Sequence, residues 1–456
     1  MDVRTARRRQ TIEEAERLKK EVTDWLTLRK NKDVDSGGYR GRYETQMSSI
    51  STEVSQAVDR VRTTAAETIP ENRATGDVFK EYNLHDQRLI WIRYAWDYFR
   101  DKLDQRDDEN LKPILEAADE VCWTSYATFF RSAGLSVPAA PIPYIEYDYV
   151  PSALRVGQSH ILSRKPGADA GPLKEYFKAL PVPLLRLPPG VTTSPWSLAL
   201  ICHEVGHILQ EYVEPNKEFF TTFSDLVSSA IKGVGGTTTD EKTWARWSQE
   251  IFADMCMAVT TGPWSVWAIA PWVVTEDAAM KQPFDNYPPP IVRLSLLDRM
   301  SRAAEMPEAQ EIFQQLQITT EDFAFVNAVA DIAKRQLTIN QRKRTLGGFL
   351  ASSAESLGKT GRISQWASQL LGKGDLVPES DKTSARDAVV AAVKAHFLSL
   401  QTDTELDSLR TKCTSLIRDC HDSGVRAGTV PRAPDKSLSD SLFNLSEEDL
   451  LAPGMP

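Results

Sequence analysis

The sequence predicts a mainly α-helical protein of the α+β class with a small mixed β-sheet, and three observations carry this prediction. Apolar residues recur at helical spacing over residues 11–132 and again over residues 307–420. Residues 137–190 instead combine many prolines with short runs of β-branched and aromatic residues, which favour strands. Residues 197–213 are apolar on nearly all sides, as expected for a helix buried in a core.

Length and composition indicate an ordinary globular protein of more than one lobe. The chain has 456 residues, of which 41% are hydrophobic and 26% charged. Its 54 basic and 63 acidic residues give a net charge of −9, which argues against nucleic acid as the main partner.

The cellular compartment is predicted from what the sequence lacks. Its first residues contain no apolar stretch like that of a signal peptide, and no run approaches the length of a membrane span. Five cysteines without paired spacing indicate free thiols, at positions 122, 202, 256, 413 and 420. We therefore expect a cytoplasmic protein without a membrane partner; the sequence leaves its oligomeric state open.

Residues 1–135 are predicted to form a helical N-terminal lobe. Helical apolar spacing runs over about 11–30, 43–68, 75–104 and 113–132, and the breaks between these segments carry glycine or proline. The aromatic residues of the third segment are expected to be core residues.

Residues 136–300 are predicted to form the central core. Short β runs cover Ile142–Val150, Ala153–Ser163 and Val182–Leu187, and the prolines among them restrict these strands to edges or short pieces. Expected helices follow at 197–213, 216–232, 241–261 with Asp240 as N-cap, 263–280, and in a last segment ending at Met300.

The rest of the chain divides into two parts. Residues 301–424 are expected to be a helical C-terminal lobe, interrupted around Gly347-Gly348 and between Gly372 and Ser380. Residues 425–456 are rich in Pro, Ser and Asp, and they are expected to be a mobile tail.

The buried segment 197–213 contains the chain's most informative motif, His203-Glu-Val-Gly-His207. Residues four apart lie on one face of a helix, so both imidazoles can bind one metal ion. Glu204 then lies close enough to act on a water molecule held by that ion. The alternative is a polar cluster without metal, but two imidazoles and a carboxylate buried together would then all need other partners.

A zinc site needs a third protein ligand, and a catalytic one leaves one position open. The segment 244–259 presents Glu250 and Asp254 one helical turn apart, beside an apolar face. Glu250 is the candidate third ligand, and Asp254 is the candidate acceptor for an imidazole N–H. Alternatively, Glu250 forms a surface pair with Arg246, four residues earlier.

The pair of motifs, HEVGH followed by Glu250-Ile-Phe-Ala-Asp254, resembles the gluzincin group of zinc metallopeptidases, of which thermolysin is a member. The resemblance covers roughly residues 181–293 and implies a gluzincin-like zinc core. It implies His203, His207 and Glu250 as Zn²⁺ ligands, Glu204 as the general base and Asp254 as the supporting acid. The chain departs from thermolysin by a longer separation of 42 residues between His207 and Glu250.

Gluzincins also place a His or Tyr beside the metal to stabilise the oxyanion, and Tyr287 is the candidate here; packing on the neighbouring prolines is the alternative. Arg293 is expected to pair with an acid. Together these features predict a zinc metallopeptidase acting on a peptide or protein substrate. Two other functions stay open: a helical scaffold with a structural or vestigial zinc, and a zinc-dependent hydrolase of a non-peptide amide.

Overall fold

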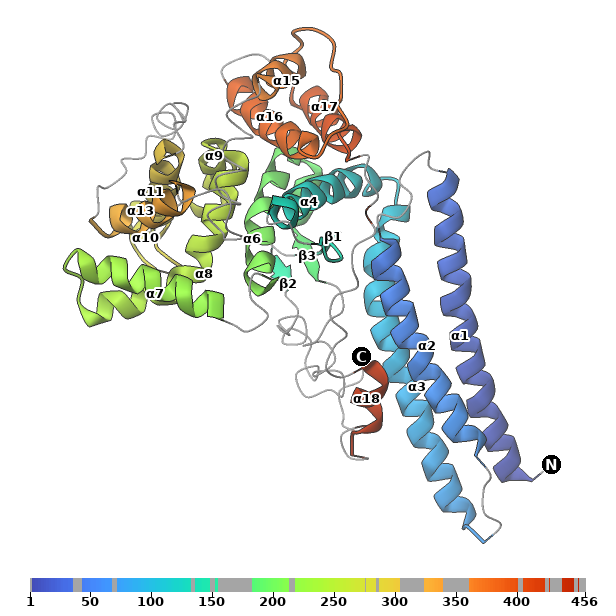
Figure 1. Cartoon of the computed structure of the whole chain (residues 1–456). Coiled ribbons are helices and arrows are strands. Elements are labelled where there is room, and N and C mark those ends of the chain that lie inside the picture. Colours follow the sequence, from blue (N-terminus) through green and yellow to red (C-terminus); the bar gives the residue numbers. More distant parts are fainter. Residues whose placement is uncertain are drawn as a thin grey trace. The chain divides into compact units, whose positions relative to one another are not determined.

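A computed structural model gives the fold of the chain (Figure 1). The chain forms two compact units. Unit 1 comprises Met1–Asp104, Leu154–Pro183 and Val425–Pro456, and unit 2 comprises Gln105–Ala153 and Leu184–Gly424. The residues that the structure describes are 2–35, 43–67, 72–132, 136–147, 152–154, 183–212, 218–274, 276–283, 287–303, 324–338, 361–400, 405–422, 426, 437–446 and 450.

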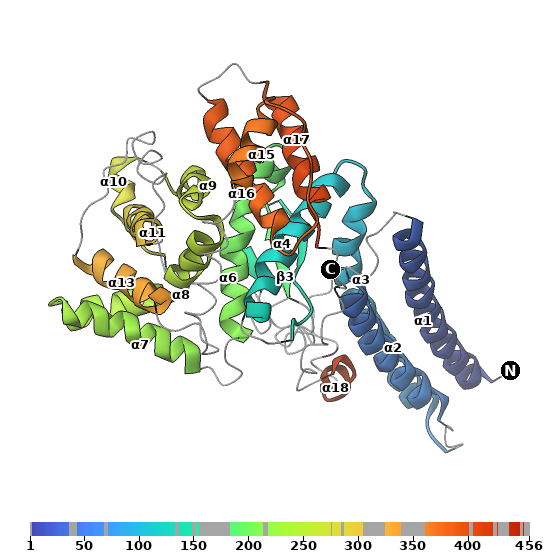
Figure 2. The same ribbon diagram turned by 45° about the horizontal axis from the view of Figure 1, so that its top comes forward.

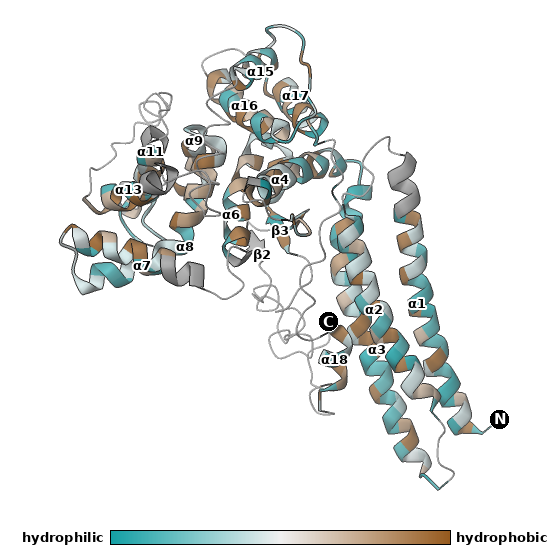
Figure 3. Ribbon diagram, in the orientation of Figure 1, coloured by the Kyte–Doolittle hydropathy of each residue, from teal (hydrophilic) through white to brown (hydrophobic). Residues whose placement is uncertain are grey.

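Unit 1 contains three long helices, α1 (Val3–Asp35), α2 (Glu44–Ala66) and α3 (Thr75–Asp104), which pack against one another. Polar and apolar residues alternate along them in Figure 3, because each helix buries one side and exposes the other. Trp25 of α1 meets Trp96 of α3 edge to face, with ring centroids 5.0 Å apart. The three helices predicted for this part of the chain are therefore confirmed.

A fourth helix of unit 1, α18 (Leu438–Phe443), packs against α2 and α3. Ser437 caps it by accepting a hydrogen bond from the Asp440 backbone N–H at 3.0 Å. Within the expected mobile tail, this segment is helical, and Leu438 and Leu442 are fully buried. The remaining residues of the expected tail, except 426, 444–446 and 450, lie outside the described part of the chain.

Unit 2 has one continuous hydrophobic core, which extends from Ile114 to Cys420. Both α4 (Lys112–Ser132) and the late helices α16 (Ser384–Ser399) and α17 (Leu406–Asp419) contribute to it. The observed division thus falls at residue 104 rather than 135, and the described helices between residues 301 and 424 share the central core. The other helices of unit 2 are α6 (Ile201–Tyr212), α7 (Glu218–Gly233), α8 (Thr238–Thr261), α9 (Trp264–Val273), α10 (Asp277–Met280), α11 (Pro290–Ala303), α13 (Ala324–Thr338) and α15 (Arg362–Leu370).

The small sheet has the strand order β1-β3-β2. Strand β1 (Ile142–Ile145) pairs in parallel with β3 (Leu184–Leu187), with Ile142 opposite Leu184. Strand β2 (Ser152–Leu154) is short. A small β-sheet in this part of the chain is confirmed, and residues 148–150, 155–163 and 182 of the predicted runs lie outside the described residues.

Two further sequence expectations can be compared with the described residues. All five cysteines are free and buried, as their spacing predicts. None of the described helices combines the length and the apolar character needed to cross a bilayer.

Candidate metal centre

The first candidate ligands lie on α6, which begins after a short 3-10 helix, η4 (Pro195–Leu200). Pro195 occupies the first turn of η4, and Ser197 donates its backbone N–H to the Ser194 carbonyl at 2.8 Å. Every residue from Ile201 to Gln210 is buried, so the apolar residues around the HExxH motif place it inside the core. The predicted helix is confirmed over the described residues, but residues 197–200 adopt the tighter 3-10 form.

Gly206 lies on the side of α6 that packs closely against α8. A Cβ atom at Gly206 would lie 2.9 Å from Cα of Ala253 and 3.0 Å from Cβ of Cys256, which is too close for an ordinary contact. Glycine therefore lets the two backbones approach. Figures 1 and 2 both show α6 and α8 side by side. This approach brings Glu250 and Asp254, on α8, to the histidines of α6.

Three side chains form the cluster: His203, His207 and Glu250. The two Nε2 atoms are 3.2 Å apart. Glu250 lies 3.2 Å from His207 Nε2 through Oε1 and 3.4 Å from His203 Nε2 through Oε2. Each of these residues is at most 9% exposed. Arg246, the alternative partner of Glu250, is exposed on α8.

These separations fit a tetrahedral metal ion. Ligand atoms bound about 2.0–2.1 Å from zinc in tetrahedral geometry lie about 3.3 Å from one another. The Nε2–Nε2 separation of 3.2 Å agrees with that value, and Glu250 approaches the two imidazoles with a different oxygen each, at 3.2 and 3.4 Å. Oε2 of Glu250 is buried, and its neighbours are His203 Nε2 at 3.4 Å and Arg293 Nη2 at 3.8 Å. Two imidazoles and one carboxylate are a typical donor set for zinc, so the residues present fit the ion.

Asp254 supports the cluster from behind His203. Its Oδ1 lies 3.0 Å from His203 Nδ1, on the side of the ring away from the cluster. Arg293, on α11, donates Nε to Asp254 Oδ2 at 2.8 Å and Nη2 to Oδ1 at 2.7 Å. This bidentate pair fixes the carboxylate, and the carboxylate in turn orients the imidazole with Nε2 toward Glu250. Asp254 is fully buried, so it depends on these partners.

The pKa shifts follow from this packing. Burial lowers the pKa of His203, but its hydrogen bonds to Asp254 and Glu250 outweigh burial and raise the pKa to about 9. Burial raises the pKa of Glu250, yet the charge of His207 and the hydrogen bonds from both histidines hold it well below its usual value. Burial likewise opposes ionisation of Asp254, and Arg293 overcomes it and lowers the pKa. The two acids therefore stabilise the protonated form of His203, and the histidines and Arg293 stabilise the ionised acids.

The two remaining predicted site residues, Glu204 and Tyr287, differ in how deeply they are buried. Glu204 lies on α6 between the two histidines in sequence, and it is 6% exposed. Tyr287 is 43% exposed, in the segment just before α11. It lies near enough to Arg293 to influence the pKa of that residue. The cluster thus brings together His203, His207, Glu250 and Asp254.

Sequence reasoning missed the structural role of one residue and specified that of another only in part. Gly206 is an unassigned position of the HExxH motif, and a glycine inside a buried helix is the signal that could have identified a close helix contact. Arg293 was expected to pair with some acid, and its partner is Asp254. A single sequence shows no such pairing between residues 39 positions apart.

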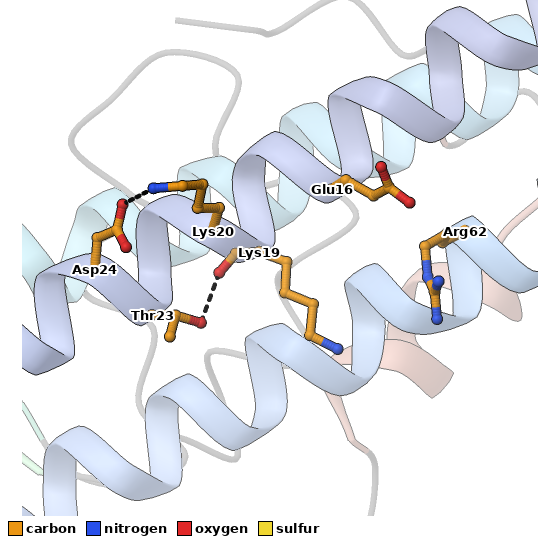
Figure 4. A pocket seen from close by; sticks show the side chains of 6 residues that line it. All are labelled: Glu16, Lys19, Lys20, Thr23, Asp24 and Arg62. Carbon is orange, nitrogen blue, oxygen red and sulfur yellow. Dashed lines mark hydrogen bonds and ion pairs between the residues drawn. The ribbon is translucent and has the colours of Figure 1, made fainter.

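Unit 1 contains a cavity that is lined by charged and polar side chains. It has a volume of about 330 Å³ and lies in unit 1, between α1 and α2. Figure 4 shows its lining residues, and Lys20 bonds to Asp24 there. Lys19 and Arg62 both pair with Asp59. Its lysines and its arginine thus have acidic partners, and the cavity is no counterpart of the metal cluster.

Comparisons with protein-family models, with curated proteins and with solved structures found no significant match to this chain. The candidate centre is therefore interpreted from its own residues.

Proposed function

We propose that this protein is a zinc-dependent metallopeptidase whose metal ligands are His203, His207 and Glu250. The observation that supports the proposal most strongly is the convergence of three buried side chains: the two Nε2 atoms are 3.2 Å apart, and the Glu250 carboxylate reaches them with one oxygen each, at 3.2 and 3.4 Å, which is compatible with a zinc site. Three protein ligands leave a fourth position for water or substrate, as in catalytic zinc sites.

Each residue has a distinct part in the proposed reaction. A zinc ion bound at this cluster would polarise a carbonyl group and make a water molecule more acidic. Glu204 accepts the proton of the attacking water and donates it to the leaving amine. Asp254, held by Arg293, keeps His203 in the orientation that presents Nε2. The assignment of a peptide as the substrate rests on the resemblance to gluzincins.

A second candidate function is a helical scaffold with a structural zinc. The observation that favours it is the amount of helix that lies apart from the cluster. The long helices α1, α2 and α3 of unit 1 contribute no cluster ligand. In a scaffold, Glu204 would have no chemical role, whereas the ligands would still matter for folding.

The test measures metal content and turnover separately. Elemental analysis is expected to find about one zinc per chain, and His203→Ala is expected to lose it. Glu204→Gln keeps the shape of the side chain but cannot accept a proton, so it should retain zinc and the fold while cleavage of a peptide library falls about 10²–10⁴-fold. Glu241→Gln, at the start of α8, is the matched control and should cleave normally.

Two outcomes contradict the proposal. Absence of metal from protein purified and incubated with zinc would remove the metal site. If Glu204→Gln behaves like the wild type while His203→Ala is defective, the zinc is structural and the scaffold function is correct.

A further inference from the structure

A second interaction surface lies in unit 1, where α18 packs against both α2 and α3 (Figure 1). We call the surface that receives α18 the α2–α3 groove and define it by three residues that hydrogen-bond to residues 438–443, which are Glu53, Arg60 and Arg88. It contains no residue of the metal cluster, and the argument is independent of the proposed peptidase function.

Two leucines anchor α18 in the groove. Leu438 and Leu442, one helical turn apart, are both fully buried. The backbone N–H of Leu438 donates to Glu53 Oε2 at 2.9 Å, and Arg88 Nε donates to the Leu442 carbonyl at 3.5 Å. The groove therefore accepts the apolar face of a helix and also bonds to its backbone.

Charge and aromatic contacts add specificity to this fit. Arg60 donates Nη1 to Asp440 Oδ1 at 3.0 Å. The guanidinium carbons of Arg60 and Arg88 lie 4.3 Å and 4.6 Å from the centroid of the Phe443 ring. Two cations close to one another repel, and a nearby acid and the face of an aromatic ring offset this repulsion. Asp440 and Phe443 supply both.

The occupant is short enough to be displaced. The helix has six residues, and helices of fewer than about 12 residues are marginally stable by themselves in water. Residues 437–443 therefore gain their helical order from the groove, and the ordering cost reduces the net stability of docking. A longer helix of the same pattern, already folded in its own protein, would not bear this cost.

We propose that the α2–α3 groove is a binding site for a short acidic amphipathic helix of a partner protein, and that α18 occupies it as a tethered ligand. The partner helix carries two leucines four residues apart, an aromatic residue directly after the second leucine, and an acid two residues before it. This pattern is that of Leu438, Asp440, Leu442 and Phe443, and it matches the two arginines of the groove in charge.

The experiment uses the full chain and a fluorescent synthetic peptide of residues 436–451. In the tail-released variant Leu438→Asp/Leu442→Asp, the chain's own helix can no longer dock, because two carboxylates would have to leave water at positions that are fully buried. Fluorescence anisotropy is expected to show that the peptide binds this variant at least tenfold more tightly than the wild type, whose groove is occupied. A peptide with the same two substitutions should bind neither protein.

Groove variants in the tail-released chain test the chemistry of the site. Arg60→Ala/Arg88→Ala should weaken peptide binding at least tenfold. Arg62→Ala removes a nearby arginine of α2 that pairs with Asp59, and it should leave binding unchanged. If Arg62→Ala weakened peptide binding as much as Arg60→Ala/Arg88→Ala, the attraction would be non-specific and the proposal would be overturned.

Two further outcomes overturn it. The first is a tail-released chain that keeps its helical circular dichroism but binds no peptide. The second is a wild-type chain that forms concentration-dependent dimers through its tail, because the occupant is then a second copy. If the tail-released chain does not fold, the proposal is tested instead with a chain that carries a protease site inserted between residues 427 and 436. After cleavage, the severed tail should exchange with the labelled peptide, and failure to exchange makes α18 a permanent part of the fold.

Discussion

Gly206 and Ala253 mark the close contact on which the candidate metal centre depends. A Cβ on Gly206 would lie 2.9 Å from the Cα of Ala253, a distance that real Cβ contacts do not show. Ala253 lies between Glu250 and Asp254 on α8, whereas Gly206 directly precedes His207 on α6. The missing side chain therefore sets the distance between the helix that carries the histidines and the helix that carries the acids.

Adding a side chain at this contact should separate the two helices. Gly206→Ala is expected to destabilise the fold by about 1–3 kcal/mol, because backbone atoms rather than flexible side chains must move. It should also weaken zinc binding, because Glu250 would move away from the histidines. Thermal unfolding and competition with a chelator measure the two effects. Gly233→Ala is the control, because nothing lies within 4 Å of a Cβ there; a loss as large in the control would disprove the role of the contact.

Most of the helices could be predicted because their apolar spacing is regular and their breaks are marked. The segment 75–104 is helical over the residues expected, and the irregular stretch from Gly372 to Ser380 is present. Where details differ, local chemistry explains them. Thr237, rather than Asp240, caps α8, because Thr237 Oγ1 accepts the Asp240 N–H and Asp240 accepts the Thr237 N–H in return.

The cluster itself was predictable because its residue types and spacing restrict the possible chemistry. His203, Glu250 and Asp254 lie together as the two motifs require. By contrast, the partner of Arg293 and the docking of α18 depend on contacts between segments far apart in the sequence. The composition of residues 425–456 indicates a mobile tail, yet two leucines one turn apart are enough to form a helix where a groove receives them.

Asp254 provides a direct test of how His203 is oriented. Asp254→Asn keeps the size of the side chain but removes its charge, and the pair with Arg293 is then lost as well. Zinc affinity is expected to fall about 10–100-fold, as for other groups that orient a ligand histidine. A competition assay with a chelator of known affinity measures the change. Asp225→Asn, on α7, is the control, and an unchanged affinity in Asp254→Asn would exclude Asp254 from the site.

Arg293 should act on zinc binding through Asp254. Arg293→Met retains much of the apolar side chain but leaves the fully buried Asp254 without its bidentate partner. Both stability and zinc affinity are therefore expected to decrease. The double variant Arg293→Met/Asp254→Asn should lose less zinc affinity than the sum of the single losses, since the two residues act as a unit. Additive losses in this double-mutant cycle would contradict the coupling.

The cap of α8 allows a smaller test of local stability. Thr237→Ala removes one half of the capping box and should cost about 1 kcal/mol, measured by denaturant unfolding. Thr243→Ala, inside the same helix, should change stability less, because it lies beyond the capped first turn. A greater loss at Thr243 would contradict the assignment of the cap.

The lowered pKa of His396 predicts how the stability of the fold depends on pH. Its ring stacks on Trp196 with centroids 3.9 Å apart, and Trp267 Nε1 donates to its Nδ1 at 3.2 Å. Burial lowers the pKa of His396 from 6.5 to about 4, and the positive charge of Arg410 acts in the same direction. The folded protein therefore keeps this imidazole neutral down to about pH 4, while the unfolded chain takes up a proton below about pH 6.5.

Since the unfolded state binds more protons in this range, His396 should make the fold less stable as the pH falls from 6.5 to 4, and it should have no such effect above 6.5. His396→Gln does not titrate, but it keeps a hydrogen-bond acceptor near Trp267. Its free energy of unfolding should lie below that of the wild type at pH 7.5, because the ring stack is lost, and the difference should shrink toward pH 4. Urea unfolding at several pH values, followed by tryptophan fluorescence, measures this. A difference that stays constant between pH 7.5 and 4 would show that His396 does not couple protonation to folding.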